Sequence, residues 1–424
     1  MSVYNWLLAR REILLASLTS LLYRSIAACA AFVSTLFIAR ALGAEQSGYF
    51  FLAFSLVSIF ATVSRIGMDY TVIRFVGAEP GQACSVLTKV LIASSVVSFP
   101  VSIGLYFFAN LIASELFEKP ELAESLRMIS FGVVGLALFT LTANALQGLR
   151  KVSVSIFILN ICMHFLLVSA VYLGVTKDAG SLSGFYSIAA LANAMLGIGL
   201  FLWFRPKKYL HEIPWKMIWG SCLPLWAVTV MGQMVQWSGQ FIAGAYVNSG
   251  LVAQLAVAQR TAMLASFVLI AVNLVVAPRF AALHRQGDMS GLQSLAITSV
   301  KLIGVMALPV VGMMLVFPSW LMGLFGESFD DGASLLQILA IGQFLNAITG
   351  SVGSLLMMSG HERDLRNVTL ISGFTALFLT WLLTIGFGAQ GNAVGTAVAV
   401  ATQNLLAVYF VKKRLGFNTL AVWR

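Results

Sequence analysis

The sequence predicts an all-α polytopic membrane protein with twelve transmembrane helices. Its 424 residues are 59% hydrophobic and only 10% charged, whereas soluble domains carry roughly 25% charged residues. Polar clusters divide the chain into apolar runs of about 20 residues, the length at which a helix crosses the hydrocarbon core. The runs are continuous and do not alternate in polarity, which excludes the strands of a membrane barrel.

The twelve apolar runs follow one another along the chain. Their centres lie near residues 30, 57, 100, 136, 163, 194, 229, 264, 306, 346, 378 and 401. The first run, "SLLYRSIAACAAFVSTLFIAR" from Ser20 to Arg40, is too long for the core of a signal peptide and has no convincing cleavage site. We therefore expect it to remain in the protein as the first span.

The basic residues predict which loops face the cytoplasm. Lysine and arginine concentrate in cytoplasmic loops, and with cytoplasmic termini most of the 26 basic residues fall on the inner side. The outer segments hold only Arg40, Lys119, Arg127 and Lys177. The net charge of +10 then faces the anionic headgroups of membrane lipids, and a nucleic-acid partner is not needed to explain it.

Two similar segments indicate that the chain contains an internal duplication. "LFEKPELAESLRMISFG" (Leu116 to Gly132) recurs as "LFGESFDDGASLLQILAIG" (Leu324 to Gly342). Six spans in each half give both halves the same orientation, so we expect two lobes related by a pseudo-twofold along the membrane normal, with a site between them. The predicted parts are an N-terminal six-helix lobe (1–204), a basic cytoplasmic linker (205–216) and a C-terminal six-helix lobe (217–424).

Amide side chains form stripes on two of the spans. Polar residues inside a span avoid lipid and face protein or water. One reading is hydrogen bonding between helices, and the other is a hydrated central cavity that binds sugar hydroxyls. On the second reading the cavity residues are Gln233, Gln236 and Gln240 in the seventh span, and Gln343 and Asn346 in the tenth.

Two arginines fall inside spans, where a charge is costly. Arg24 lies near the inner end of the first span, so it either snorkels to the headgroups or faces the cavity. Arg260 lies about 15 Å deep if its span runs from Gly250 to Pro278, at a rise of 1.5 Å per residue. It either pairs with another helix or binds substrate. Guanidinium groups bind phosphate in a bidentate manner, so both arginines are candidate substrate-binding residues.

The positions of the acidic residues predict the sign of the charge on the ligand. All sixteen lie in loops or at the cytoplasmic side, which favours an anionic substrate over a cationic one. His164 is a candidate coupling residue because its charge changes near neutral pH, although a role in helix packing is the simpler explanation. The four cysteines lie far apart in the sequence, and we expect neither a metal site nor a cofactor. No catalytic motif is present, and the chain is predicted not to be an enzyme.

Two stretches carry a family resemblance. "FIARALGAEQSGYFFLAFSLVSIFATVSRIGMDYTVIRFVG" (Phe37 to Gly77) resembles the opening of Wzx-type flippases, and "YVNSGLVAQLAVAQRTAML" with "APRFAAL" resembles their eighth span. These flippases belong to the multidrug/oligosaccharidyl-lipid/polysaccharide exporter superfamily. The resemblance implies that an undecaprenyl-diphosphate-linked repeat unit crosses the bacterial inner membrane by alternating access. It also implies a role in O-antigen or a related surface polysaccharide, with a polymerase and chain-length machinery as partners.

Two other functions stay open at the level of sequence. A cation-coupled multidrug exporter of the same superfamily shares the architecture but usually carries an acidic residue in or near its first span. A membrane-embedded polysaccharide polymerase or glycosyltransferase also handles lipid-linked glycans. Such an enzyme needs an outer catalytic platform, and the outer loops of this chain are short.

Overall fold

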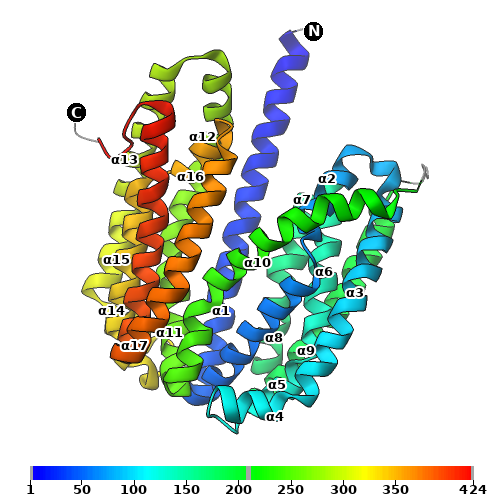
Figure 1. The fold of residues 1–424 in the computed structure, drawn as a ribbon, viewed down its shortest axis with the longest axis vertical. Helices are drawn as coiled ribbons and strands as arrows, with labels where there is room; N and C mark the ends of the chain where they lie inside the picture. The colour runs from blue at the N-terminus through cyan, green and yellow to red at the C-terminus, as the bar shows by residue number, and fades with distance from the viewer. Residues whose placement is uncertain (1–2, 207–211, 422–424) are drawn as a thin grey trace. The chain divides into compact units, whose positions relative to one another are not determined.

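The computed structural model describes residues 3–206 and 212–421, and its regular elements are helices (Figure 1). In the first half these are α1 (Val3–Ser64), α2 (Met68–Ala78), α3 (Ala83–Phe107), α4 (Ala109–Leu111), α5 (Leu122–Ile129), α6 (Gly132–Gly148), α7 (Val152–Ile156), α8 (Cys162–Tyr172) and α9 (Ala179–Phe204). The second half holds α10 (Trp215–Tyr246), α11 (Ser249–Ala262), α12 (Ser266–Gln286), α13 (Met289–Val316), α14 (Pro318–Gly323), α15 (Ala333–Thr349), α16 (Val352–Met358) and α17 (Glu362–Leu415).

Many of these helices are long and apolar enough to cross a membrane. Among the described residues, eight meet both conditions, or nine if the bent pair α5 and α6 counts as one span. A lipid environment favours helices because each one satisfies its own backbone hydrogen bonds. The expectation of an all-helical, multi-pass membrane protein is therefore confirmed, whereas twelve spans stay a prediction.

Two of the long helices are interrupted by glycine. The backbone of α1 leaves helical geometry at Gly43 (φ 72°) and that of α17 at Gly388 (φ 58°), a region of positive φ that glycine adopts without strain. A straight helix from Asp364 to Arg414 would be about 75 Å long at 1.5 Å per residue. The Arg414 guanidinium instead donates to both carboxylate oxygens of Asp364, at 2.7 and 3.1 Å. The chain of α17 therefore reverses direction at Gly388.

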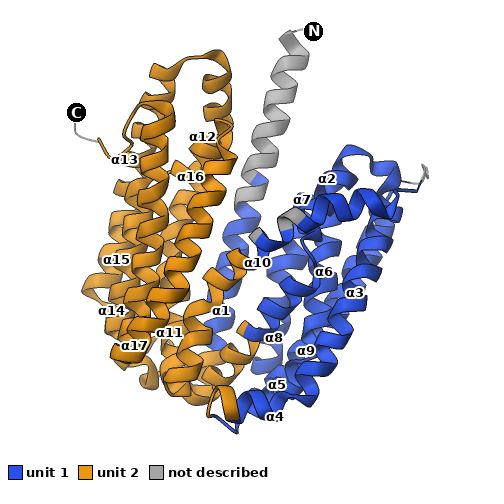
Figure 2. Cartoon of the chain, viewed as in Figure 1, with its two compact units in different colours: residues 1–37, 56–114, 119–230 blue, residues 38–55, 115–118, 231–424 orange. Residues whose placement is uncertain are grey.

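The described chain divides into two compact units, which are coloured separately in Figure 2. Unit 1 consists of Met1–Phe37, Leu56–Ser114 and Lys119–Val230, and unit 2 of Ile38–Ser55, Glu115–Glu118 and Met231–Arg424. This division differs from the predicted boundaries at residues 204 and 217, since both α1 and α10 change unit within their length. Residues 207–211 of the predicted linker lie outside the described residues. The arrangement as two six-helix lobes stays a prediction.

Local contacts explain why α10 and α1 are divided. In the first part of α10, the Trp226 indole donates to the Val63 carbonyl at 3.2 Å, which holds this part in unit 1. In its second part, Trp237 packs edge-on against Phe54 at 5.4 Å between ring centroids, within unit 2. The middle of α1 joins unit 2 through Gly48, whose backbone lies directly against the backbone of Ser249.

Unit 1 is built around α6. Its backbone approaches α9 so closely at Gly135 that a Cβ there would lie 2.6 Å from Ala190, the small-residue contact by which membrane helices associate. A polar cluster anchors the other end of α6. Asp69 accepts hydrogen bonds from the Arg65 guanidinium at 2.7 Å and from the Asn144 amide at 3.3 Å. The buried charge of Arg65 is thereby paired within the protein.

Unit 2 is organised by α15, which packs against α11, α13 and α17. Its Gly342 lies against Ala397 of α17, where a Cβ would come within 2.8 Å of the alanine side chain. A cluster of buried apolar side chains, which includes Phe280 and Val408, closes the unit around α12, α16 and α17. This packing leaves the polar residues of several helices facing a common space, described below.

We predict that Gly135→Ala destabilises the protein, because the added methyl group overlaps Ala190 and overpacking a filled site costs about 1–3 kcal/mol. The measurement is the apparent melting temperature of the purified protein in detergent. The matched control is Gly199→Ala in α9, where no atom lies within 4 Å of the new Cβ. A Gly135→Ala protein as stable as the control would show that α6 and α9 are not in close contact.

Candidate functional site

A polar pocket of about 350 Å³ lies within unit 2. It is lined by residues of α10, α11, α12, α15 and both segments of α17, and by the 3₁₀ turn Met263–Ala265 that separates α11 from α12. Irregular backbone at membrane depth is tolerated where it borders a cavity. The polar lining residues are Gln236, Ser238, Gln259, Ser266, Gln343, Asn346, Ser372, Thr380, Thr396, Gln403 and Asn404.

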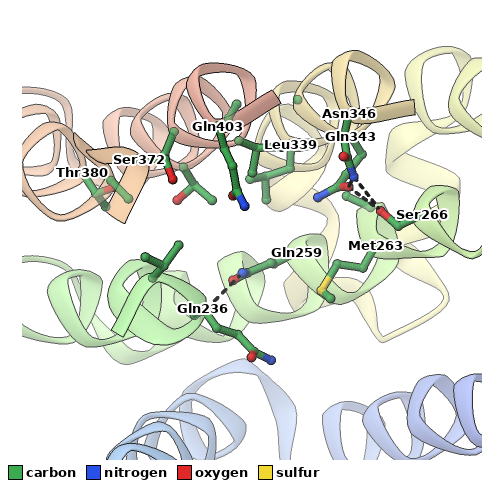
Figure 3. A pocket seen from close by; sticks show the side chains of 18 of the residues that line it. Gln236, Gln259, Met263, Ser266, Leu339, Gln343, Asn346, Ser372, Thr380 and Gln403 are labelled. Atoms are coloured by element: carbon green, nitrogen blue, oxygen red, sulfur yellow. Dashed lines mark hydrogen bonds between the residues drawn. The ribbon is translucent and has the colours of Figure 1, made fainter. Parts of the chain in front are cut away.

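The amides approach the pocket from opposite sides (Figure 3). Gln343 and Gln403 enter from α15 and α17, whereas Gln259 and Met263 lie on the facing side. The Gln259 amide donates a long hydrogen bond of 3.5 Å to the Gln236 carbonyl. The pocket therefore presents amide groups from several helices to the same volume.

A hydrogen-bonded triad fixes one wall of this pocket. The Ser266 hydroxyl donates to the Gln343 side-chain oxygen at 2.6 Å. The Asn346 amide donates to the same oxygen at 3.3 Å and approaches the Ser266 hydroxyl at 3.4 Å. Because the Gln343 oxygen accepts both bonds, its amide nitrogen keeps two donors for a ligand.

The structure brings three of the predicted cavity residues together and separates two others. Gln236, Gln343 and Asn346 all line this pocket. The Gln233 oxygen accepts a hydrogen bond of 2.8 Å from the Trp237 indole, so Gln233 serves a contact along α10. Gln240 is buried, with 2% of its surface exposed, and is not among the lining residues.

Arg260 sits in the last turn of α11 and is not among the lining residues of the pocket. Its guanidinium carbon lies 4.3 Å from the centroid of the buried Phe51 ring, a cation–π contact within unit 2. A positive charge at a helix C-terminus is also favoured by the partial negative charge of the carbonyls there. These two contacts give Arg260 a structural reason to lie at this depth. Its neighbour Gln259 reaches the pocket instead.

Arg24 and His164 both belong to unit 1. Arg24 is exposed on α1, in a stretch where Leu22 and Ile26 are exposed as well. His164 is half-buried in the first turns of α8, after the π-helical turn Phe157–Ile161. The roles of Arg24 in substrate binding and of His164 in coupling stay predictions.

The polar residues of α17 were missed by the sequence reasoning. Gln403 and Asn404 belong to "ATQNLLAV" in the last apolar run, and Thr380 and Thr396 lie in the two segments of α17. Adjacent amides within an apolar run are a usable signal, because polar groups at membrane depth avoid lipid. Gln259 directly precedes Arg260 and Ser266 follows it by six residues, and neither was among the predicted site residues.

The chain is similar to known proteins both in sequence and in fold. A model of the polysaccharide biosynthesis protein family matches residues 15–284. The probable low-salt glycan biosynthesis flippase Agl15 of Haloferax volcanii is 23% identical over 389 residues, which cover 90% of this chain and 79% of the relative.

Two solved structures share the fold at low sequence identity. The inward-facing conformation of a multidrug resistance MATE family transporter of the MOP superfamily superposes with a TM-score of 0.76 and 15% identity, covering 94% of this chain and 98% of that one. The lipid II flippase MurJ, in an inward closed conformation, gives a TM-score of 0.75 and 15% identity, covering 94% and 87%.

We predict that a cysteine placed at Thr396 reacts with a charged, water-soluble methanethiosulfonate reagent, because Thr396 lines the pocket. The background is a variant in which the four native cysteines are replaced by alanine. The control is Thr384→Cys, one turn beyond Thr380. The Thr384 side chain is 2% exposed and is not part of the pocket lining. Labelling is read by mass spectrometry, and equal labelling of both variants would contradict a hydrated pocket at Thr396.

Proposed function

The chain belongs to the polysaccharide biosynthesis protein family, and we propose that it is a flippase that moves lipid-linked glycans across a membrane. The observation that carries this proposal is the family match together with an uncharged, amide-lined pocket inside the membrane-spanning part of the protein. Amides and hydroxyls satisfy the hydroxyl groups of a sugar that has left water. The family match also agrees with the resemblance noted in the sequence.

The relative named as a glycan biosynthesis flippase supports transport over catalysis. This relative and the family match both agree with the prediction that the chain is not an enzyme. The described residues that line the pocket include no carboxylate. A cationic drug would therefore find no opposite charge in this pocket, and the pocket does not favour the hypothesis of a cationic-drug exporter. A glycan substrate fits its chemistry better.

The finer parts of the proposal concern the substrate and the membrane. We propose that the substrate is an undecaprenyl-diphosphate-linked repeat unit for O-antigen or another surface polysaccharide. It is moved from the cytoplasmic to the periplasmic leaflet of a bacterial inner membrane by alternating access, before polymerase and chain-length machinery act on it. The bias of basic residues supports cytoplasmic termini.

Twelve crossings are part of the same proposal. Dividing α1 at Gly43 and α17 at Gly388 adds two spans to the eight apolar helices. The bent pair α5 and α6 adds one, and the 32-residue α10 is long enough to add another. An even number of crossings keeps both termini on the same side of the membrane.

We propose that the substrate diphosphate is held by arginine, with Arg260 as the principal residue and Arg24 as a second contact. Guanidinium binds phosphate oxygens through two parallel hydrogen bonds, a geometry that lysine does not offer. The Arg260 guanidinium carbon lies 4.3 Å from the centroid of the Phe51 ring, a cation–π contact that supports a defined position for this charge. The amides Gln233, Gln236, Gln240, Gln343 and Asn346 are proposed to serve the glycan, and His164 the coupling to an ion gradient.

The test is the leaflet in which the lipid-linked repeat unit resides in cells that lack this protein. We predict accumulation in the cytoplasmic leaflet, cured by the natural sequence and only weakly by Arg260→Ala at equal protein level, with a loss of rate on the order of tenfold or more for one lost charged contact. Arg260→Lys is expected to be intermediate.

Arg285→Ala, at the exposed end of α12, is the matched control and should restore transport fully. Repeat units that reach the outer leaflet without the protein, and stay unpolymerised there, would overturn the flippase proposal. Full activity of Arg260→Ala would remove only the proposed role of Arg260.

A further inference from the structure

The lining of the unit 2 pocket is neutral throughout. Among the described residues that form it, carboxamides and hydroxyls supply the polar groups, and acidic or basic side chains do not take part. Apolar side chains complete the wall, among them Val235, Met263 and Leu339. A ligand that fits this lining must itself be uncharged, polar on its edges and apolar in part.

We propose that this pocket is a subsite for one or two uncharged sugar rings of the transported glycan, and that it discriminates against sugars that carry a carboxylate. This inference rests on the proposed function and deepens it. It assigns a preference among glycans to the pocket, whereas the diphosphate is bound elsewhere.

The hydrogen-bonding capacity of the lining supports a sugar ligand. The triad of Ser266, Gln343 and Asn346 is already hydrogen-bonded within itself, so the amides are held in place before a ligand arrives. The Gln343 nitrogen then offers donors, and the Asn346 side-chain oxygen offers an acceptor. Donors and acceptors side by side match a hydroxyl group, which both donates and accepts.

The same lining opposes an acidic sugar. A carboxylate accepts hydrogen bonds but donates none, so it would leave the acceptor oxygens of the pocket without a partner. Moving an ionised group out of water without a counter-charge is far more costly than moving a hydroxyl. The nearest basic side chain in sequence is Arg260, which is engaged with Phe51 and is not part of the lining.

The size of the pocket limits how much of the glycan it holds. A volume of about 350 Å³ lies at the lower end of the roughly 300–1,000 Å³ typical of small-ligand sites. It suits one or two rings but not a branched repeat unit. The Met263 and Leu339 side chains supply apolar contact for the face of a pyranose or the methyl group of an acetamido sugar.

Three synthetic probes with the same polyprenyl chain test this inference. The first is the bare polyprenyl diphosphate, the second carries a disaccharide of N-acetylglucosamine, and the third carries a disaccharide that ends in glucuronic acid. Dissociation constants are measured with the purified full-length protein in lipid nanodiscs. We expect the neutral-sugar probe to bind about tenfold tighter than the bare diphosphate, equivalent to one or two good hydrogen bonds. The uronic acid probe should show no such gain.

Substitutions then locate the effect. Gln343→Leu and Gln403→Leu should each remove most of the gain from the neutral sugar and leave the affinity for the bare diphosphate unchanged. Gln293→Leu on the exposed surface of α13 is the control and should change none of the three constants. Gln403→Arg adds a positive charge to the pocket and should shift the preference toward the uronic acid probe.

The outcomes separate this inference from the proposed function. If the bare diphosphate binds but the neutral sugar adds nothing, or if both sugars add equally, the subsite is wrong and the flippase proposal stands. If Gln343→Leu weakens all three probes alike, its effect is structural and the subsite is again wrong. If none of the probes binds, the proposed function fails and the subsite fails with it.

Discussion

The absence of water from the membrane interior is the constraint on which the rest of this structure depends. Every backbone amide and carbonyl must find its partner inside the protein, which leaves the helix as the standard element. Side chains obey the same rule. Even near helix ends, the buried Arg65 is paired with Asp69 in unit 1, and the buried Asp364 is paired with Arg414 in unit 2. Close helix contacts at Gly135 and Gly342 supply the packing between apolar surfaces.

The pocket is one place where this rule is satisfied incompletely. The triad of Ser266, Gln343 and Asn346 uses only part of its hydrogen-bonding capacity, and the amides of Gln259 and Gln403 face the same space. The turn Met263–Ala265 interrupts the helix beside it. Unused donors and acceptors next to irregular backbone are expected where a polar ligand or water completes the set.

The sequence predicted the helical membrane fold because hydropathy and length depend on local composition. The stripes of the seventh and tenth spans likewise led to Gln236, Gln343 and Asn346. What the sequence did not predict is set by tertiary contacts. Arg260 contacts the ring of Phe51, which lies more than two hundred residues earlier in the sequence. Unit 1 ends at Val230 because the first part of α10 makes its contacts with that unit. The hydrogen bond from Trp237 to Gln233 likewise leaves no trace in the periodicity of the sequence.

A recognition surface made of carboxamides and hydroxyls has a consequence for how such a protein diversifies. Exchanging serine for threonine, or glutamine for asparagine, moves or removes one hydrogen-bonding group at the pocket wall without placing a new charge in the hydrocarbon. Each step therefore carries little cost for membrane insertion, unlike the addition of an arginine or aspartate. Since five helices each contribute to the wall, the hydrogen-bonding pattern of the pocket can change through single, independently tolerated substitutions.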